Sequence, residues 1–397
     1  MKIVFLQDDF PPQSFGGAGI STYELALGMK KAGHEVFVIT TCRKEIDAGE
    51  SEREGLKIHT IVNNYSDRWR AYVSLNNRPV VRQIERILEM IRPDVVHANN
   101  IHAYLSYKSL KVAKKYAKAV VLTARDSMLF SYDKLETKKY LNNFDPRVTW
   151  LDNLKQAGKR WNPFRNLFIR HYLNYVDKVF AISHSLKDAL ERNGIKNVGV
   201  IYNGIDVDEW NVSENAVKKF KEKYQLANKK IIFFNGRLSS AKGGNVVLKA
   251  IKNVSKEVPE AVLLVAGIGE VSAKDDVIFT GWLDREEIKV AYAASDVVLM
   301  PSICLDAFGR VNIEAMASKK PVVGTCYGGT PEIIEDGVTG YVVNPLQIDE
   351  FSAKIIDLLK NPEKAEKFGR AGRNRIQTVF NLNDKITKLI SIYERFI

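Results

Sequence analysis

Short hydrophobic runs alternate with amphipathic stretches along the first half of the chain. An apolar run at 2–7 is followed by a Pro-Pro and glycine-rich loop, a helical pattern at 20–32 and a β-rich run at 35–40, an order that predicts a βαβ unit. Further β-rich runs lie at 94–98, 119–123, 178–182 and 198–202. Such alternation is typical of a parallel sheet covered by helices on both faces.

A second series of the same kind begins after Tyr202-Asn203-Gly204. Its β-rich runs lie at 230–235, 261–266, 277–280, 296–300, 321–324 and 340–343, and helical patterns follow at about 348–360 and 363–395. At 397 residues the chain also exceeds the size of most single cores. We therefore predict an α/β protein with two doubly wound, Rossmann-like domains, at 1–203 and 204–375, and a terminal helix at 376–397 that packs back on the first. Two such sheets facing each other would form a cleft at the carboxyl ends of their strands.

Charge and cysteine content narrow the class of partner and the compartment. The net charge of +12 favours anionic partners, but no RRM, helix-turn-helix or zinc signature supports nucleic-acid binding. Cys42, Cys304 and Cys326 are an odd number at wide spacing, which favours a reducing compartment. The first apolar run is too short for a signal peptide, and no stretch reaches the ~18 apolar residues of a membrane span. We expect a cytoplasmic protein.

The segment 300–317 carries the densest candidate chemistry. It follows a hydrophobic run, breaks at a proline and enters a helix near Gly309, so the amides of Phe308, Gly309 and Arg310 can meet a phosphate or a sugar hydroxyl. Asp306 and Glu314 place two carboxylates near the same strand end, and carboxylates accept hydrogen bonds from sugar hydroxyls. The alternative is an ordinary acidic loop and an exposed helical glutamate.

Two further loops follow predicted strands. In 235–244, Arg237 and Lys242 flank a helix start and could together bind a diphosphate, or could be solvated surface cations. In the first domain, Gly16 and Gly17 belong to a Gly-Gly-Ala-Gly loop that permits close approach to a ligand, although tight-turn packing is the more frequent reason for such glycines. The loop lacks both the Gly-x-Gly-x-x-Gly pattern and a Walker lysine.

These segments, with Asn203-Gly204-Ile205-Asp206 and the Gly-Gly-Thr-Pro-Glu run from 328, closely resemble the retaining GT-B glycosyltransferases of family 4. The resemblance covers nearly the whole chain. It implies transfer of a hexose-type sugar from a UDP- or GDP-linked donor to a hydroxyl of a glycan, glycolipid or other acceptor, as in cell-envelope glycan biosynthesis. It implies no metal and no cofactor besides the nucleotide-sugar substrate.

The resemblance also implies roles for individual residues. Glu314 would hold the ribose hydroxyls, Arg237 and Lys242 the diphosphate, and Phe308 and Gly309 the phosphate or sugar through backbone amides. Gly16 and Gly17 would close on the diphosphate from the other domain, and Gly281 and Trp282 would contact the base. Arg237, Lys242 and Asp306 are the candidate catalytic residues.

The chain departs from the family pattern at two positions. Asp306 stands where the family usually has glutamate, which shortens the reach by one methylene. Arg125 stands where the family usually has histidine, and a permanent cation cannot act as a general base. Arg125 and His97, which ends a predicted strand, are candidates for the acceptor or sugar side of the site. Asp206-Val207-Asp208 imitates a metal-binding motif, but it lies in the turn between domains where the family binds no metal, and we predict no metal site.

Residues 131–178 combine cations with aromatic side chains. The cations are Lys134, Lys138, Lys139, Arg147, Lys155, Lys159, Arg160, Arg165 and Arg170, and the aromatic residues include Trp150, Trp161, Phe164, Phe168 and Tyr172. Helices in this segment could lay a basic, aromatic face on an anionic membrane at the inner face of the cell, or on a lipid-linked acceptor. The alternative is a solvated face whose aromatic side chains point into the core.

Two other functions stay open at this point. One is another GT-B enzyme, such as a phosphorylase or a sugar-nucleotide epimerase. The second is a catalytically weak protein that binds sugar nucleotides, an interpretation prompted by Asp306 and Arg125.

Overall fold

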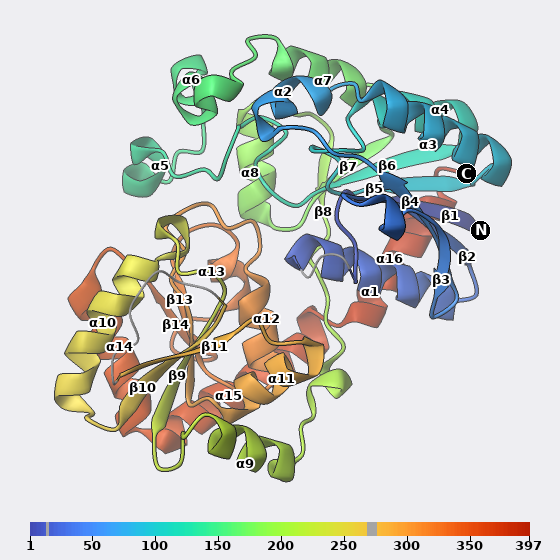
Figure 1. Cartoon of the computed structure of the whole chain (residues 1–397). Helices are drawn as coiled ribbons and strands as arrows, with labels where there is room; N and C mark the ends of the chain where they lie inside the picture. The colour runs from blue at the N-terminus through green and yellow to red at the C-terminus, as the bar shows by residue number, and fades with distance from the viewer. Residues whose placement is uncertain (13–15, 268–275) are drawn as a thin grey trace. The chain divides into compact units, whose positions relative to one another are not determined.

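The computed structural model describes residues 1–12, 16–267 and 276–397, which form two compact units (Figure 1). Unit 1 comprises Met1–Thr137, Pro146–Asn203 and Leu382–Ile397, and unit 2 comprises Lys138–Asp145 and Gly204–Asn381. Each unit is built on a sheet with helices packed against it, parallel throughout in unit 2 and parallel except for the edge strand β3 in unit 1, so the predicted fold of two Rossmann-like domains is confirmed.

Unit 1 contains an eight-stranded sheet in the order β3-β4-β2-β1-β5-β6-β7-β8. The strands are β1 (Lys2–Leu6), β2 (Glu35–Cys42), β3 (Gly49–Arg53), β4 (Leu56–Val62), β5 (Val95–Ala98), β6 (Ala119–Ala124), β7 (Lys178–Ala181) and β8 (Val198–Val200). The helices are α1 (Gly17–Lys31), α2 (Arg70–Val73), α3 (Arg78–Ile91), α4 (Lys108–Tyr116), α6 (Trp150–Ala157), α7 (Arg165–Leu173), α8 (His184–Arg192) and α16 (Leu382–Glu394). The order of strands reverses at β1, whose neighbours are β2 and β5.

The terminal helix α16 is part of the core of unit 1. It packs beside α1, and a Cβ atom on Gly28 of α1 would lie 1.9 Å from the Ile386 side chain. Leu389 and Tyr393 on the same helix are also buried. A glycine is therefore needed at position 28 for the two helices to approach this closely.

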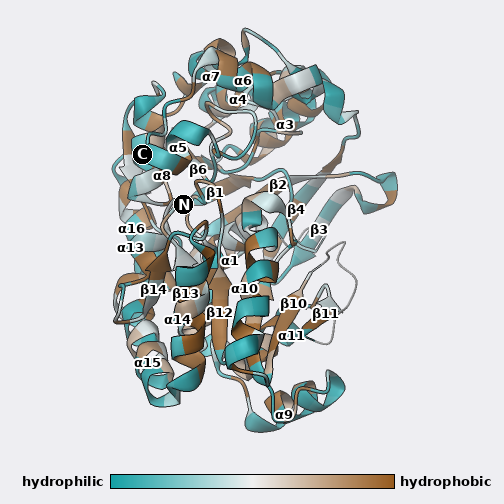
Figure 2. Ribbon diagram, turned by 90° about the vertical axis from the view of Figure 1, so that its left-hand side faces the viewer, coloured by the Kyte–Doolittle hydropathy of each residue, from teal (hydrophilic) through white to brown (hydrophobic). Residues whose placement is uncertain are grey.

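Unit 2 contains a six-stranded parallel sheet in the order β11-β10-β9-β12-β13-β14. The strands are β9 (Lys230–Asn235), β10 (Ala261–Ala266), β11 (Val277–Gly281), β12 (Val297–Met300), β13 (Val322–Thr325) and β14 (Gly340–Val343). The helices are α5 (Lys138–Asn143), α9 (Glu214–Lys223), α10 (Gly244–Glu257), α11 (Arg285–Ala294), α12 (Arg310–Ala317), α13 (Thr330–Ile333), α14 (Ile348–Lys360) and α15 (Pro362–Val379). Strands such as β10 and β12 are hydrophobic along their length, whereas the helices around them alternate in hydropathy (Figure 2). Strands buried on both faces require this pattern.

The strand order of unit 2 reverses at β9. The chain proceeds from β9 to β10 and β11 on one side and returns to pair β12 with the other side of β9. Loops that leave β9 and β12 therefore diverge from adjacent strand ends, and this is where open α/β sheets bind ligands.

A short segment from the first half of the chain belongs to unit 2. Residues 138–145, which include α5, pack on the loop after β13, where the Tyr327 hydroxyl donates to the Leu141 carbonyl at 2.9 Å. The rings of Tyr140 and Phe144 lie 5.9 and 5.6 Å from the ring of Tyr327. Within the described residues, no helix is both long and apolar enough to cross a membrane.

Candidate active site

The loops that follow β9 and β12 touch directly at the point where the strand order reverses. The Ile303 amide donates to the Ala241 carbonyl at 2.9 Å. Gly243 has a φ of 75°, and a Cβ atom there would lie 2.1 Å from the Pro301 carbonyl oxygen. Only glycine combines this backbone conformation with such a close approach, so Gly243 fixes the distance between the two loops.

This contact places Lys242 beside Asp306. The Lys242 ammonium forms a short ion pair with Asp306 Oδ2. Ser302 Oγ donates to the same oxygen at 3.2 Å, and the Gly309 amide donates to Asp306 Oδ1 at 3.0 Å. Burial disfavours the charged amine, but the Asp306 carboxylate outweighs it and holds the pKa of Lys242 above its usual range. The structure thus brings together three of the predicted site residues, and the Gly309 amide, expected to meet a ligand, binds Asp306 here.

The backbone of Asp306 is held by the two glycines of the Gly-Gly-Thr-Pro-Glu run. Gly328 has a φ of 71°, and a Cβ atom on it would lie 2.1 Å from the Asp306 carbonyl oxygen. The Gly329 amide donates to that oxygen at 2.8 Å. The Gly328 amide donates to the hydroxyl of Tyr140 at 2.9 Å, in a buried hydrogen bond. Tyr140 therefore supports Asp306 through Gly328, a connection that sequence reasoning missed.

Glu314 on α12 is buried, with 8% of its surface exposed, and is not the exposed helical glutamate of the alternative interpretation. Arg310 Nε donates to one carboxylate oxygen at 2.7 Å, and the Tyr292 hydroxyl donates to the other at 2.8 Å. Asn235, the last residue of β9, donates to the Tyr292 hydroxyl at 3.1 Å. Burial, together with the Glu314 carboxylate, raises the pKa of Tyr292 well above its usual value. Tyr292 was not predicted, because one tyrosine in a helical pattern resembles any core residue.

The other predicted residues of unit 2 differ in their surroundings. Arg237 is exposed and, within the described residues, its side chain forms no hydrogen bond or ion pair. Phe308 is buried with its ring 5.9 Å from that of Phe380, so only its backbone can face a ligand. Gly281 ends β11 at a φ of 73°, and the adjacent Trp282 side chain is 61% exposed.

In unit 1, Gly16 and Gly17 form the exposed start of α1. Gly16 is the N-cap residue, and its carbonyl accepts a hydrogen bond from the Ile20 amide at 3.0 Å. Close packing explains Gly19 of the same loop, because a Cβ atom there would lie 2.7 Å from the Asp9 carbonyl oxygen. Gly16 and Gly17 are both exposed.

The expectation that His97 faces a ligand does not fit its geometry. His97 is fully buried, with Nδ1 2.5 Å from the Tyr393 hydroxyl and Nε2 2.7 Å from Thr123 Oγ1. Burial, with the nearby Arg125 cation, lowers the pKa of His97 to about 3. Both ring nitrogens are engaged in the core, so His97 joins β5 and β6 to the terminal helix.

Arg125 is buried after β6 and connects two polar side chains. Its Nε donates to Asn99 Oδ1 at 3.0 Å, and its Nη1 donates to Asn203 Oδ1 at 2.8 Å. It therefore cross-links the loop after β5 to the end of the segment Pro146–Asn203 of unit 1.

The Asp206-Val207-Asp208 stretch forms a helix cap. Asp206 Oδ1 accepts a hydrogen bond from the Asp208 amide at 3.0 Å and caps a short 3-10 helix at Val207–Trp210. Within residues 1–12, 16–267 and 276–397, no three His, Cys, Asp or Glu side chains are grouped so that they could hold a metal ion.

Comparison with known proteins identifies the family. The family model described as Glycosyltransferase Family 4 matches residues 15–209, and the model described as Glycosyl transferases group 1 matches residues 216–375. The chain belongs to these GT-B glycosyltransferases.

Relatives and solved structures agree with this assignment. The glycosyltransferase is 24% identical to spore coat protein SA of Bacillus subtilis, over 100% of both chains. It is 29% identical to a GDP-mannose-dependent alpha-(1-6)-phosphatidylinositol monomannoside mannosyltransferase of Mycolicibacterium smegmatis, over 43% of this chain and 49% of that one. Anabaena HepE, solved in complex with UDP and glucose, superposes with a TM-score of 0.73 at 19% identity and covers 100% of both chains.

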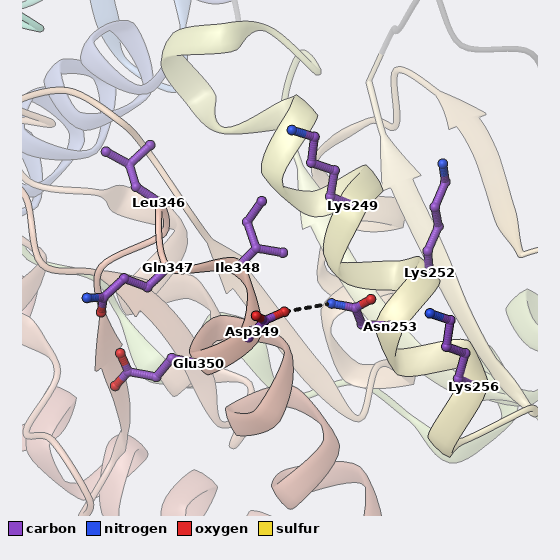
Figure 3. Close-up of a pocket in the computed structure, with 9 residues that line it drawn as sticks. All are labelled: Lys249, Lys252, Asn253, Lys256, Leu346, Gln347, Ile348, Asp349 and Glu350. Atoms are coloured by element: carbon purple, nitrogen blue, oxygen red, sulfur yellow. Dashed lines mark hydrogen bonds between the residues drawn. The ribbon is translucent and has the colours of Figure 1, made fainter.

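A groove elsewhere in unit 2 does not belong to the predicted site. It has a volume of about 740 Å³ and lies between α10 and α14 (Figure 3). Lysines 249, 252 and 256 line one wall, and Asp349 and Glu350 lie on the other, where Asn253 donates to Asp349 at 3.3 Å. None of the predicted donor residues of the glycosyltransferase lines it, which makes Lys252 a useful control position.

Proposed function

We propose that this glycosyltransferase transfers a hexose from a UDP- or GDP-linked donor to a hydroxyl acceptor, with retention of configuration and without a divalent metal. The observation that carries the proposal is the ion pair of Lys242 and Asp306, built from two loops at the reversal point of the unit 2 sheet. Ligands of open α/β sheets bind at this position.

The cations of this site would stabilise the leaving group. As the bond from the sugar carbon to the phosphate oxygen breaks, negative charge grows on the nucleoside diphosphate. Lys242 has three N–H donors and uses one on Asp306, so two stay available for phosphate oxygens. Arg237, whose side chain is exposed, would add a second cation from the same loop. Fixed cations aimed at developing charge supply the electrostatic stabilisation that a metal supplies in other enzymes.

The carboxylates would bind the hydroxyls of the donor. Glu314 is oriented by Arg310 and Tyr292, and we assign it to the ribose. Asp306 would accept hydrogen bonds from the sugar. Its present donors, Lys242 and Gly309, would then contact both Asp306 and the donor substrate. The same-face attack expected of a retaining family member would let the leaving phosphate take the acceptor proton.

The choice of donor base is supported by the relatives. Anabaena HepE was solved with UDP and with UDP-glucose, and the mycobacterial mannosyltransferase is named for GDP-mannose. These names support a UDP- or GDP-linked donor.

The acceptor side would lie in unit 1 and reach a lipid-linked or glycan acceptor. Trp150, Phe164 and Leu167 are 67%, 61% and 64% exposed, so these side chains do not point into the core. Lys155 and Lys159 are exposed in the same segment. Exposed aromatic and basic side chains suit an anionic membrane surface, and we propose peripheral contact at the inner face of the cell membrane.

A donor screen tests the proposal. The protein is incubated with UDP-, GDP- and ADP-sugars in excess EDTA, and the released nucleoside diphosphate, the melting temperature and the anomeric configuration of the product are measured. We expect one UDP- or GDP-sugar to release its nucleoside diphosphate. The new linkage should have the same anomeric configuration, axial or equatorial, as the donor. Activity that disappears in EDTA and returns with Mg²⁺ or Mn²⁺ would contradict the metal-free mechanism. Binding without transfer to a wide acceptor panel would favour a protein that only binds sugar nucleotides.

A further inference from the structure

Three arginines converge on a small pocket in unit 1 that no part of the donor site uses. Arg70 starts α2, Arg160 ends the 3-10 helix Gly158–Arg160, and Arg165 starts α7. His102, from the loop after β5, and Tyr132, from the loop after β6, complete the wall. The loops after β5 and β6 leave the carboxyl ends of their strands, on the side where α/β sheets bind ligands.

Arg165 is the buried member of the three. Arg165 is only 4% exposed, and its guanidinium lies 4.7 Å from the centre of the Tyr132 ring. It donates to the Met128 carbonyl at 2.5 Å and to Asn166 Oδ1 at 2.8 Å. These partners are neutral, so they fix the orientation of the guanidinium without compensating its charge.

The pocket carries more positive than negative charge. Within the described residues, Arg70, Arg160 and Arg165 form no direct ion pair with a carboxylate. The carboxylate of Asp126, 3.6 Å from His102 Nε2, opposes part of the charge of Arg165, and burial lowers the pKa of His102. One carboxylate against three guanidinium groups leaves a net positive charge, and burying such charge is costly, so an anion that binds here would reduce that cost.

The walls of the pocket are held in place before any ligand binds. The Asp8 carboxylate accepts three amide hydrogen bonds, from Ala103, Tyr104 and Leu105, at 2.7, 2.9 and 2.7 Å, and so fixes the loop that carries His102. On the other side, the Tyr132 hydroxyl donates to the Asn162 carbonyl at 2.7 Å. Asn162 Nδ2 in turn donates to the Ala71 carbonyl at 3.1 Å. A rigid pocket loses little entropy when a ligand binds.

We propose that this pocket binds a phosphate group of the acceptor. The inference rests on the proposed function, and it narrows the acceptor to a phosphorylated molecule. Guanidinium groups match the planar geometry of phosphate oxygens and bind them through paired hydrogen bonds. The enclosed space is about 10 Å³, enough for about one water-sized group, so one oxygen of a terminal phosphate enters between the arginines while the remainder of the phosphate and of the acceptor stays at the rim. The phosphate can belong to a soluble molecule or to a lipid headgroup.

The first test measures binding of inorganic phosphate by calorimetry at constant ionic strength. It uses the full chain with Arg237→Ala and Lys242→Ala, so that the donor site does not contribute. In this background we expect Arg70→Gln and Arg160→Gln, both at the half-buried rim, each to weaken phosphate binding about tenfold, since a charge-assisted bond is lost. The matched control Lys252→Gln, in the groove of Figure 3, should leave it unchanged. Equal phosphate affinity in the rim variants and the control would overturn the proposal.

The second test distinguishes the two sources of the phosphate. Glycerol 3-phosphate probes a soluble acceptor, and phosphatidylcholine vesicles containing phosphatidic acid probe a lipid headgroup. Binding of glycerol 3-phosphate that depends on Arg70 and Arg160 supports a soluble source. The same dependence seen only with the vesicles supports a lipid. Lys155→Gln serves as a control for nonspecific attraction, because it should weaken vesicle binding and leave inorganic phosphate binding unchanged. Dependence on the arginines in neither arm contradicts the pocket.

These binding measurements need no transfer activity. If the arginines bind phosphate but no donor is turned over, the proposed function fails and the pocket stands. If a sugar is transferred and neither arginine affects phosphate binding, the pocket fails and the proposed function stands.

Discussion

Lys242 and Asp306 form an ion pair although 64 residues separate them in the chain. Their loops follow β9 and β12, which are hydrogen-bonded neighbours in the sheet. Gly243, at its close approach to Pro301, lets the two loops meet. The geometry explains why glycine follows the lysine: without it, the cation could not reach the carboxylate.

Replacing Lys242 with alanine should impair turnover more than folding. The side chain is about one third exposed, and its loss removes a cation that strengthens its contact with the leaving group as the bond breaks. We expect a fall in the rate of transfer of ~10²–10³. The measurement is the rate constant at saturating donor, with Lys252→Ala as the control and the melting temperature as a check on folding. A Lys242→Ala enzyme with the wild-type rate would remove Lys242 from the mechanism.

Tyr140→Phe tests the support that α5 gives to Asp306. The variant keeps the ring against Tyr327 but leaves the buried Gly328 amide without its acceptor, which should cost about 1–3 kcal/mol in the free energy of unfolding. Because Gly328 contacts the Asp306 backbone, the rate of transfer should fall while nucleoside diphosphate affinity stays near that of the wild type. Tyr224→Phe, at the half-buried residue that follows α9, is the comparison variant. If transfer and stability are both unaffected, the hydrogen bond from Gly328 to Tyr140 has no functional role.

Glu314→Gln should weaken binding of the nucleotide. The glutamine amide lacks the negative charge that pairs with Arg310. It also has a single acceptor oxygen, whereas the two oxygens of Glu314 accept one hydrogen bond each, from Arg310 and Tyr292. If Glu314 holds the ribose, the dissociation constant of the nucleoside diphosphate should rise by about tenfold, the loss of one charge-assisted hydrogen bond. Calorimetry with UDP and GDP provides the measurement. Unchanged affinity for both nucleotides would assign Glu314 a purely structural part.

Asp8 should make stability depend on pH. Burial raises the pKa of its carboxyl to about 7, despite the opposing hydrogen bonds from Leu105 and Ala103. Between about pH 4 and 7 the folded protein therefore holds a proton that the unfolded chain releases, so the free energy of unfolding falls as the pH rises across this range and levels off above pH 7. Asp8→Asn cannot titrate at this position. Its free energy of unfolding should therefore rise relative to that of the wild type, by up to a few kcal/mol, as the pH increases from 4 to 8. Denaturant unfolding at a series of pH values measures the difference, and a difference that does not vary with pH would contradict the buried, proton-binding carboxyl.

Much of the fold could be predicted from the sequence, because strands buried on both faces appear as uninterrupted apolar runs. The hairpin of β3 and β4 was missed. Its strand Gly49–Arg53 is polar and exposed at the edge of the sheet, so it has no hydrophobic alternation to detect.

The candidate site was predictable in part, for a related reason. Lys242 and Asp306, in loops after strands, and Glu314, on the helix that follows one of these loops, stand out by position. Tyr140 and Tyr292 act through one hydroxyl each, and a single tyrosine carries no local signal of its partner. His97 stood out by position because it ends a predicted strand, but it does not face a ligand. Its partner Tyr393 lies 296 residues away in the chain, so the sequence carries no local signal that His97 is buried.

The central claim, that the Lys242 and Asp306 pair forms part of the donor site, is tested most directly by Asp306→Ala, with nucleoside diphosphate affinity and sugar transfer measured side by side. The account predicts that transfer is lost while the nucleotide still binds, because Glu314, Arg237 and Lys242 hold the nucleotide end independently of Asp306. Asp306→Asn should be intermediate, since it keeps one acceptor oxygen but loses the stronger charge-assisted bond. Transfer by Asp306→Ala at the wild-type rate would contradict the claim.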